Sequence, residues 1–252
     1  MIGLNWVMLL PASLTEEQFE DWYLNVHSPY VETAYGVKRY VINRVVANQP
    51  AAATGDFYRL AQEYWADWES MERCWNSAGG HVLLGDGLVN MGLDPGTIAG
   101  VGVTENEQLE VASPAIFDVV RGGFAARPDG TNTRFMALGL AEAGAGIGAW
   151  YRERHATLGR DPRVRAHVFG TTLGKRVKVG LQGQIPGPEQ HLYDWNLELW
   201  FDGNEDAHAF LGSDGFGAMW EDLGAVTSSR VAALFRGQER MMISAPLPHK
   251  DD

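Results

Sequence analysis

Hydrophobic and polar positions in the first hundred residues follow in turn the two-residue period of strands and the 3.6-residue period of helices. Strand-like apolar runs are separated by two stretches in which apolar residues recur every three to four positions. The pattern predicts a strand at 2–10, a helix at 15–27, strands at 37–47 and 58–66, a helix at 69–77 and a strand at 97–104. The first half of the chain is therefore expected to have the element order βαββαβ.

The second half of the chain repeats this order. Its predicted elements are a strand at 134–141, a helix at 147–158, strands at 164–172 and 192–201, a helix at 204–211 with a broken extension to 223, and a strand at 231–243. A βαββαβ unit is ferredoxin-like, with helices on one face of an antiparallel sheet, so the other face must be buried. We therefore predict an α+β fold in which the antiparallel sheets of two ferredoxin-like repeats pack face to face into a pseudo-dimeric α+β barrel. Aromatic side chains are expected to fill its interior, namely Trp6, Trp65, Phe169, Trp195, Trp200 and Phe201.

Two motifs recur in the two halves. The pattern W-Y-x-x-x-H ends at His27 and again at His155, about half the chain further on. YRLAQEYWAD, from Tyr58, matches YDWNLELWFD, from Tyr193, at nearly the same offset. Two matches in the same order indicate a tandem duplication. The predicted domains are a first repeat at 1–112, a connecting β-rich segment at 113–133 and a second repeat at 134–252.

The first predicted helix has clear boundary signals. Thr15 and Gln18 make a capping box, in which each side chain satisfies a backbone N–H that the helix leaves unpaired. The buried stripe of the helix is predicted to hold Phe19, Trp22, Tyr23 and Val26. Pro29 is expected to end the helix or to lie just past its end, which puts His27 at the helix C-terminus.

Composition and charge argue against some classes of function. The chain has 252 residues, with 20 basic and 32 acidic side chains and a net charge of −12. Without a basic block, such a chain would repel nucleic-acid phosphates and anionic membranes, so neither partner is expected. The first basic residue is Lys38, which leaves no charged start for a secretion signal, and no apolar run is long enough to cross a bilayer. We expect a soluble cytoplasmic protein, and the preference for Arg over Lys is associated with GC-rich bacterial genomes.

The residues around His27 resemble a known family. A helix with W-Y-x-x-x-H-S-P, followed by a strand with Val37 and Tyr40, is similar to the EthD family of the dimeric α+β barrel superfamily. The second half keeps the Trp, the Tyr and His155 but has Ala-Thr where the first has Ser-Pro. The resemblance implies a cavity between sheet and helices in each repeat, and small, often aromatic or polyketide-like substrates. Superfamily relatives include cyclases, dehydratases, decarboxylases, cofactor-free monooxygenases, haem proteins and interaction modules, so the fold alone does not choose a function.

His27 and His155 are the predicted catalytic residues. A helix C-terminus favours imidazolium and burial favours the neutral ring, so His27 can titrate near neutral pH and act as a general acid or base. Simple helix capping is the alternative role for His27. His155 recurs at the equivalent place, and because duplicated pockets often diverge, one of the two can be catalytic and the other structural. His81 follows a Gly79-Gly80 hinge and is expected in a loop. The predicted substrate contacts are Tyr23, Tyr30, Tyr40, Trp65, His81 and His167.

Glu63 and Glu198 recur in the matched strands, and each shares a strand face with a tryptophan. A buried carboxylate without a partner is costly, so each is expected either to pair with an arginine or to serve the function. The arginines considered for this pairing are Arg39, Arg44 and Arg165.

No cofactor and no metal site is predicted. The one cysteine, Cys74, is expected to be a packed core thiol, and the chain has no zinc-type His pair, no P-loop and no nucleophile elbow. The glycine-rich pieces at 92–96 and 212–215 do not keep the G-x-x-D-G spacing of dye-decolourising peroxidases, which disfavours haem.

Three functions stay open at this point. The first is a cofactor-independent enzyme that uses a helix-terminal His as general acid or base on a small hydrophobic substrate, in dehydration, decarboxylation or cyclisation. The second is a cofactor-free monooxygenase with the same fold. The third is a non-catalytic barrel for ligand binding or interaction. The expected partner is an aromatic or other hydrophobic small molecule, and a homodimer is left open.

Overall fold

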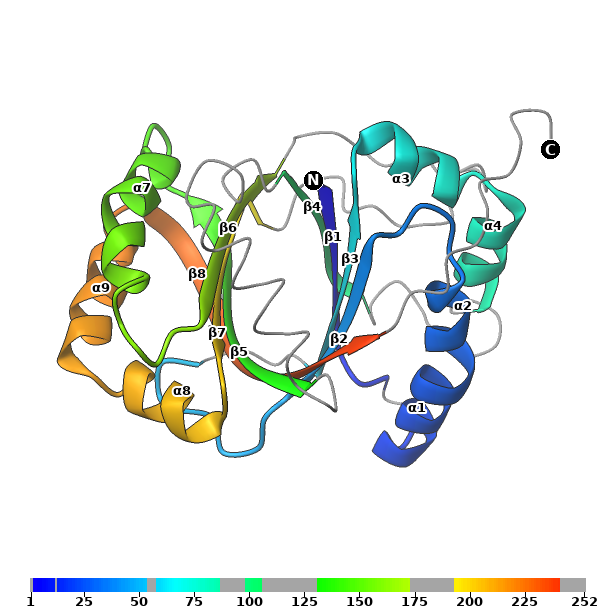
Figure 1. Ribbon diagram of the computed structural model, residues 1–252, viewed down its shortest axis with the longest axis horizontal. Helices are drawn as coiled ribbons and strands as arrows, with labels where there is room; N and C mark the ends of the chain where they lie inside the picture. The colour runs from blue at the N-terminus through cyan, green and yellow to red at the C-terminus, as the bar shows by residue number, and fades with distance from the viewer. Residues whose placement is uncertain are drawn as a thin grey trace.

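The computed structural model describes residues 2–11, 13–53, 58–86, 98–105, 131–172 and 193–240. Its strands form a closed barrel, and helices from the two halves of the chain cover it on opposite sides (Figure 1). The strands are β1 (Ile2–Met8), β2 (Arg39–Val45), β3 (Arg59–Trp65), β4 (Ile98–Glu105), β5 (Thr131–Ala141), β6 (Ala166–Thr172), β7 (Trp195–Phe201) and β8 (Thr227–Arg240). The helical segments are α1 (Glu16–Trp22), η1 (Tyr23–His27), α2 (Ser28–Glu32), α3 (Trp68–Trp75), α4 (Ala78–Gly85), α7 (Ile147–Leu158), α8 (Asn204–Leu211) and α9 (Asp214–Gly224). None of the described helices is long and apolar enough to span a bilayer.

The barrel consists of two four-stranded sheets joined edge to edge. The first half contributes β4-β1-β3-β2 and the second half β8-β5-β7-β6, the same ferredoxin-like order used twice. The sheets are joined where β2 pairs with β8 and where β4 pairs with β6, both antiparallel. The predicted α+β barrel of two βαββαβ repeats is confirmed. Its domain boundaries stay a prediction, because most of the 113–133 segment lies outside the described residues.

Large aromatic side chains lie mostly outside the barrel, which corrects the expectation of an aromatic interior. Trp6 and Trp65 pack in a core under α1 to α4, and Phe169, Trp195 and Phe201 pack in a second core under α7 to α9. Strand side chains alternate between the two faces, and helices packed on the outer face bury larger apolar groups there. Among the six predicted residues, Trp200 is the one that joins the interior, where the Arg134 guanidinium lies over its ring.

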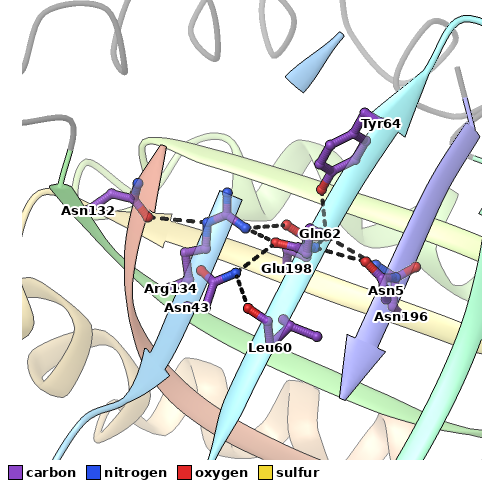
Figure 2. A network of polar contacts seen from close by, with 9 residues as sticks. All are labelled: Asn5, Asn43, Leu60, Gln62, Tyr64, Asn132, Arg134, Asn196 and Glu198. Carbon is purple, nitrogen blue, oxygen red and sulfur yellow. Dashed lines mark hydrogen bonds and ion pairs between the residues drawn. The ribbon is translucent and has the colours of Figure 1, made fainter. Parts of the chain in front are cut away.

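The interior of the barrel holds an apolar cluster and a polar network. The apolar cluster is made of Leu60, Met136, Leu138, Ala233 and Phe235. The network contains Asn5, Asn43, Gln62, Tyr64, Asn132, Arg134, Asn196 and Glu198 (Figure 2). Gln62 Nε2 on β3 donates to Glu198 Oε1 on β7 at 2.7 Å, so the network ties the two halves together.

The first predicted helix continues past Pro29 instead of ending there. The predicted capping box is confirmed, and α1 runs through a π-helical turn, η1, directly into α2. Ser28 N–H donates to the Tyr23 carbonyl, five residues back. This wider turn accommodates Pro29, whose missing N–H and bulky ring would disrupt a regular α-helical turn. It also rotates the residues around it, so Val26 is 40% exposed rather than in the buried stripe, and His27 is not at a helix end.

His81 lies in a helix and not in a loop as predicted. Gly79 and Gly80 belong to α4, whose N-terminus is capped by Ser77. A Cβ on Gly80 would lie 2.3 Å from the Cys74 carbonyl oxygen, so glycine at this position permits close packing of α4 on the end of α3. The Cys74 thiol is buried in this core, as expected.

Candidate functional site

His27 on η1 and Asp86 at the end of α4 form a pair on the helical side of the first half. His27 Nδ1 lies 3.0 Å from Asp86 Oδ2, and the side chains are 17% and 2% exposed. Because a carboxylate only accepts hydrogen bonds, Asp86 keeps the proton of a neutral imidazole on Nδ1 and leaves the lone pair on Nε2. Nε2 makes no hydrogen bond within the described residues. The rings of Trp22 and Tyr23 flank the imidazole, with centroids at 4.9 and 5.3 Å, and help to hold its orientation. This is the arrangement of a general base that a carboxylate orients.

Two buried tyrosines and a serine form a chain of hydroxyls next to this pair. The Tyr23 and Tyr40 hydroxyls share a hydrogen bond at 3.0 Å, and the Tyr40 hydroxyl lies 3.3 Å from Ser28 Oγ. Burial raises the pKa of Tyr23 to about 12. Burial, and then the neighbouring Tyr23, raise the pKa of Tyr40 well above its ordinary value. Both phenols therefore stay protonated near neutral pH and serve as hydrogen-bond donors, not as bases.

Glu63 is buried beside the same tyrosines. It pairs across the sheet with Tyr40, and its charge contributes to the raised pKa of both Tyr23 and Tyr40. Burial raises the pKa of the Glu63 carboxyl to about 8, with a smaller opposing effect from the Trp6 indole. Within the described part of the chain Glu63 makes no ion pair, so it is mostly protonated at neutral pH.

An ion pair connects α1 to the sheet next to Tyr23. Arg59 on β3 donates to the Glu20 carboxylate, and its guanidinium carbon lies 4.3 Å from the centroid of the Tyr23 ring. The Tyr58 hydroxyl donates to the same carboxylate at 2.9 Å. The positive charge of Arg59 lowers the pKa of Tyr23, although burial has the larger effect.

The second half keeps the tyrosine but not the His–Asp pair. The Tyr151 hydroxyl lies 2.8 Å from His167 Nδ1, at positions that correspond to Tyr23 and Tyr40. Burial, with a smaller contribution from His155, lowers the pKa of His167 to about 4, so this ring is neutral. His155 Nδ1–H donates to the Arg152 carbonyl at 2.7 Å, one turn back on α7. No carboxylate pairs with His155 among the described residues, and α7 has no π-helical turn.

Aromatic and aliphatic side chains occupy the corresponding space in the second half. Phe169 stacks on Tyr151 with a centroid distance of 4.7 Å, and Trp195 stacks on Phe169 at 6.4 Å. Leu199 pairs with His167 across the sheet, as Glu63 pairs with Tyr40. Leu199 therefore stands where the first half has its buried carboxyl.

Glu198 faces the other side of its sheet from Glu63. Gln62 precedes Trp68, where α3 begins, by as many residues as Glu198 precedes Asn204, where α8 begins. Gln62, and not Glu63, therefore corresponds to Glu198. Glu198 lies inside the barrel, with its Oε2 at 3.4 Å from Arg134 Nη1 (Figure 2). The expected arginine partner is confirmed for Glu198, but it is Arg134. The arginines considered from the sequence contact other groups: Arg39 lies over Trp200, Arg44 pairs with Glu16 and Arg165 pairs with Asp202.

Residues 11–88 match the family model of the EthD domain. The first half carries an EthD domain. Both His27 and Asp86 lie within the matched residues, whereas His155 lies outside them. None of the curated proteins matches the chain in sequence.

Solved structures show the same fold over nearly the whole chain. A structure described as an anthrone oxidase-like protein has a TM-score of 0.59 at 13% identity and covers 98% of this chain and 96% of its own. A proposed monooxygenase from Fusobacterium nucleatum subsp. nucleatum has a TM-score of 0.55 at 6% identity, with 97% and 96% covered. An EthD family protein from Bacillus halodurans C-125 is 20% identical, has a TM-score of 0.36 and covers 42% of this chain and 97% of its own. At such identities the first two likenesses establish the fold and leave the activity open.

The EthD domain brings together some of the predicted site residues and separates others. Tyr23 and Tyr40 lie with His27, and Trp65 is fully buried in the core beneath, with its ring centroid 6.3 Å from that of Trp75. Tyr30 is 43% exposed on α2, and His81 is partly buried on α4. His167 belongs to the second half, so it contributes nothing to the His27 pair.

Asp86 is the site residue that the sequence did not reveal. It stands between two glycines after an apolar helix, and no local pattern relates it to His27, 59 residues earlier. The only signal was the presence of one acidic residue in an otherwise apolar segment. No group of three or more metal-ligating side chains occurs among the described residues.

Proposed function

We propose that the EthD domain is a cofactor-independent enzyme in which His27 Nε2 removes a proton from a small hydrophobic substrate. The contact between His27 and the buried Asp86 is the observation that carries this proposal. It orients the ring and leaves one nitrogen with a lone pair, and a general base of this kind contributes roughly 10²–10⁴-fold to a rate. The hydroxyl chain of Tyr23 and Tyr40 stays protonated and supplies donors for negative charge that develops nearby.

An aromatic or polyketide-like compound with an acidic C–H or phenolic O–H beside a carbonyl is the substrate class that fits. The imidazole lies among the rings of Trp22 and Tyr23, which suits a flat, apolar molecule. Loss of the proton gives an anion whose charge is shared with the carbonyl oxygen. Such an anion can expel a β-hydroxyl group, which leaves as water once it is protonated, or attack a second carbonyl to close a ring. In a decarboxylation the departure of CO₂ forms the anion instead, and His27 in its protonated form returns a proton to it. These are the lyase and cyclase reactions expected from the sequence.

Oxygenation is the second candidate, and the likeness of nearly the whole chain to a structure described as anthrone oxidase-like favours it. In that reaction the carbanion formed at His27 adds O₂ and a proton to give a hydroperoxide. The hydroperoxide then loses water and leaves a carbonyl. The two candidates share the proton abstraction and differ in the fate of the anion.

Deuterium exchange tests the shared step. Anthrone is incubated with the protein in D₂O under argon, and exchange at its acidic methylene is followed by NMR against the rate in buffer. The wild-type protein should catalyse exchange, and His27→Ala should lose at least ~10²-fold of the excess rate. A His27→Ala protein that exchanges as fast as the wild type would contradict the proposal.

Admission of air then distinguishes the two candidate reactions. Anthraquinone formed only after O₂ is admitted favours the monooxygenase, whereas a dehydrated or cyclised product from a hydroxylated polyketide under argon favours the lyase. Binding of such compounds without any excess exchange or turnover favours the third candidate, a non-catalytic binding barrel.

A homodimer and a cytoplasmic location stay predictions. The barrel closes within one chain, because β2 pairs with β8 and β4 pairs with β6. A second copy is therefore not required to bury an open sheet face.

A further inference from the structure

A groove of about 620 Å³ lies at the seam where β2 pairs with β8. It is bordered by α1 and η1 from the first half and by Asn204, the first residue of α8, from the second half. In Figure 1, α1 and α8 flank this end of the barrel from the two sides. The groove is thus built by both halves and does not include His27 or Asp86.

Three arginines lie in one row across the groove. Arg59 on β3 is in register with Arg44 on β2, and Arg44 is in register with Arg236 on β8. Because neighbouring strands are about 4.8 Å apart, the backbone positions of the three side chains fall within roughly 10 Å. A row of like charges at this spacing is unfavourable unless anions compensate it.

Two of the three charges are compensated. Glu20 pairs with Arg59, and Glu16 pairs with Arg44. Arg236 is exposed and makes no hydrogen bond or ion pair within the described residues. The row therefore keeps one uncompensated positive charge, on a protein whose net charge is −12.

Arg59, which contributes to the lining of the groove, also has an unused donor. Its side chain is 2% exposed, and its Nε is buried without a hydrogen-bond partner, while Nη2 donates to Glu20. A buried N–H without an acceptor is costly, and an acceptor that enters the groove would remove that cost. Arg236 therefore lacks an anionic partner among the described residues, and the Nε–H of Arg59 lacks a hydrogen-bond acceptor.

The remaining wall of the groove is largely apolar, with Asn204 and Gln238 as polar residues at the second-half side. Leu24, Ile42, Val46 and Ala47 contribute to it. An inorganic anion would leave this wall exposed to water, and a neutral hydrocarbon would leave Arg236 unpaired. A carboxylate with a short hydrocarbon or aromatic body satisfies both parts, since guanidinium binds carboxylate through charge-assisted hydrogen bonds.

We infer that this seam groove is a binding site for a small organic carboxylate. The carboxylate binds Arg236 and the Nε–H of Arg59, and the hydrocarbon lies against Leu24 and Ile42. The site is separate from the His27–Asp86 pair and does not depend on the function proposed for it. The two sites share one wall, because Leu24 follows Tyr23 and Arg59 lies over the Tyr23 ring.

Isothermal titration calorimetry of the full chain at low ionic strength tests the inference, with hexanoate, acetate and 1-hexanol as probes. Hexanoate should bind at one site, and both acetate and hexanol should bind at least about tenfold more weakly. Arg236→Gln should weaken hexanoate binding by about tenfold or more. Arg230→Gln is the matched control, because Arg230 lies on the same strand but over Trp220 and outside the groove, and it should leave the affinity unchanged.

Circular dichroism confirms that each variant is folded before titration, and Arg236 is exposed, so its loss should not disturb the barrel. Equal hexanoate affinity in wild type and Arg236→Gln would overturn the inference, and it would also place any observed binding elsewhere in the protein. Equal affinity for acetate and hexanoate would overturn the role of the apolar wall. Absence of any heat from hexanoate would overturn the site altogether.

Discussion

Both halves bury an apolar core between sheet and helices, but the first half also places a carboxyl group and a His–Asp pair there, although the strands and helices of the two halves correspond. Tyr40 and Glu63 face this space in the first half, and His167 and Leu199 take their positions in the second. Phe169 then stacks where the first half has Ile42. The two halves have therefore diverged: the first holds titratable groups around a His–Asp pair, and the second fills the corresponding space with stacked aromatic and aliphatic side chains.

The two halves also neutralise a buried carboxyl in different ways. Glu63 on the helical side has no cationic partner among the described residues and holds its proton to about pH 8. Glu198 in the barrel interior has Arg134 and the amide of Gln62 instead. In apolar surroundings a bound proton is sufficient to neutralise a buried carboxyl group. A buried carboxylate that keeps its charge needs an arginine and further hydrogen-bond donors to stabilise it.

Substitution of His27 should show the largest difference in activity between variants of the two halves. His27→Ala is expected to lower kcat by ~10²–10⁴-fold with the fold intact, because the oriented base is lost. The matched variant His155→Ala should stay within about twofold of the wild type, since His155 bonds only to its own helix backbone among the described residues. Steady-state kinetics measure kcat for each variant, and circular dichroism checks that each variant is folded. Equal losses in the two variants would mean that the halves share the reaction.

Breaking the interior ion pair should have the largest effect on stability. Arg134→Met leaves Glu198 buried without its cation and is expected to cost roughly 3–5 kcal/mol in the free energy of unfolding. Adding Glu198→Met should recover most of this loss, because both charges of the pair are then removed. Urea unfolding followed by tryptophan fluorescence gives both values. A double variant as unstable as the single one would contradict the role of the unpaired charge.

Stability should fall with rising pH because of Glu63. Its pKa is about 8 in the folded chain, against an ordinary value of 4.5, so between these pH values the folded state binds more protons than the unfolded state. The contribution of Glu63 to the free energy of unfolding is therefore fully present below pH 4.5 and is lost as the pH rises through 8. Glu63→Gln should remove this slope and be more stable than the wild type at pH 9 by roughly 2–4 kcal/mol. Identical slopes in the two proteins would show that Glu63 is not the group responsible.

His167 should have the opposite and smaller effect. Its pKa is about 4 in the folded chain, against 6.5 ordinarily, so the unfolded state binds more protons between these values and stability is lost as the pH falls from 6.5 to 4. His167→Tyr installs the residue that the first half has at this place and should reduce the acid-dependent loss by roughly 1–3 kcal/mol. Thermal unfolding from pH 4 to 7 provides the comparison. An unchanged acid slope in this variant would refute the assignment to His167.

Local sequence patterns were enough to predict the order of the elements and the internal repeat. Period-two and period-3.6 patterns are local, so they predicted βαββαβ twice, the 147–158 helix with its observed bounds and the Thr15–Gln18 capping box. The repeated Trp-Tyr pairs also placed Tyr23 and Tyr151 at equivalent positions. These features depend on residues that are close to one another in the sequence, so a single sequence was enough to predict them.

The contacts between distant side chains, in contrast, follow from the tertiary packing and could not be predicted from local patterns. Shifting the strand alignment by a single position reverses the sheet face, so the two glutamates that match in sequence lie on opposite sides of the sheet. The π-helical turn changes the direction of His27 relative to His155, although both stand four residues after a tyrosine. Asp86 reaches His27 only because α4 packs back beside α2. Such contacts depend on the packing of segments far apart in the chain, and this packing is set by the whole barrel and not by any local pattern.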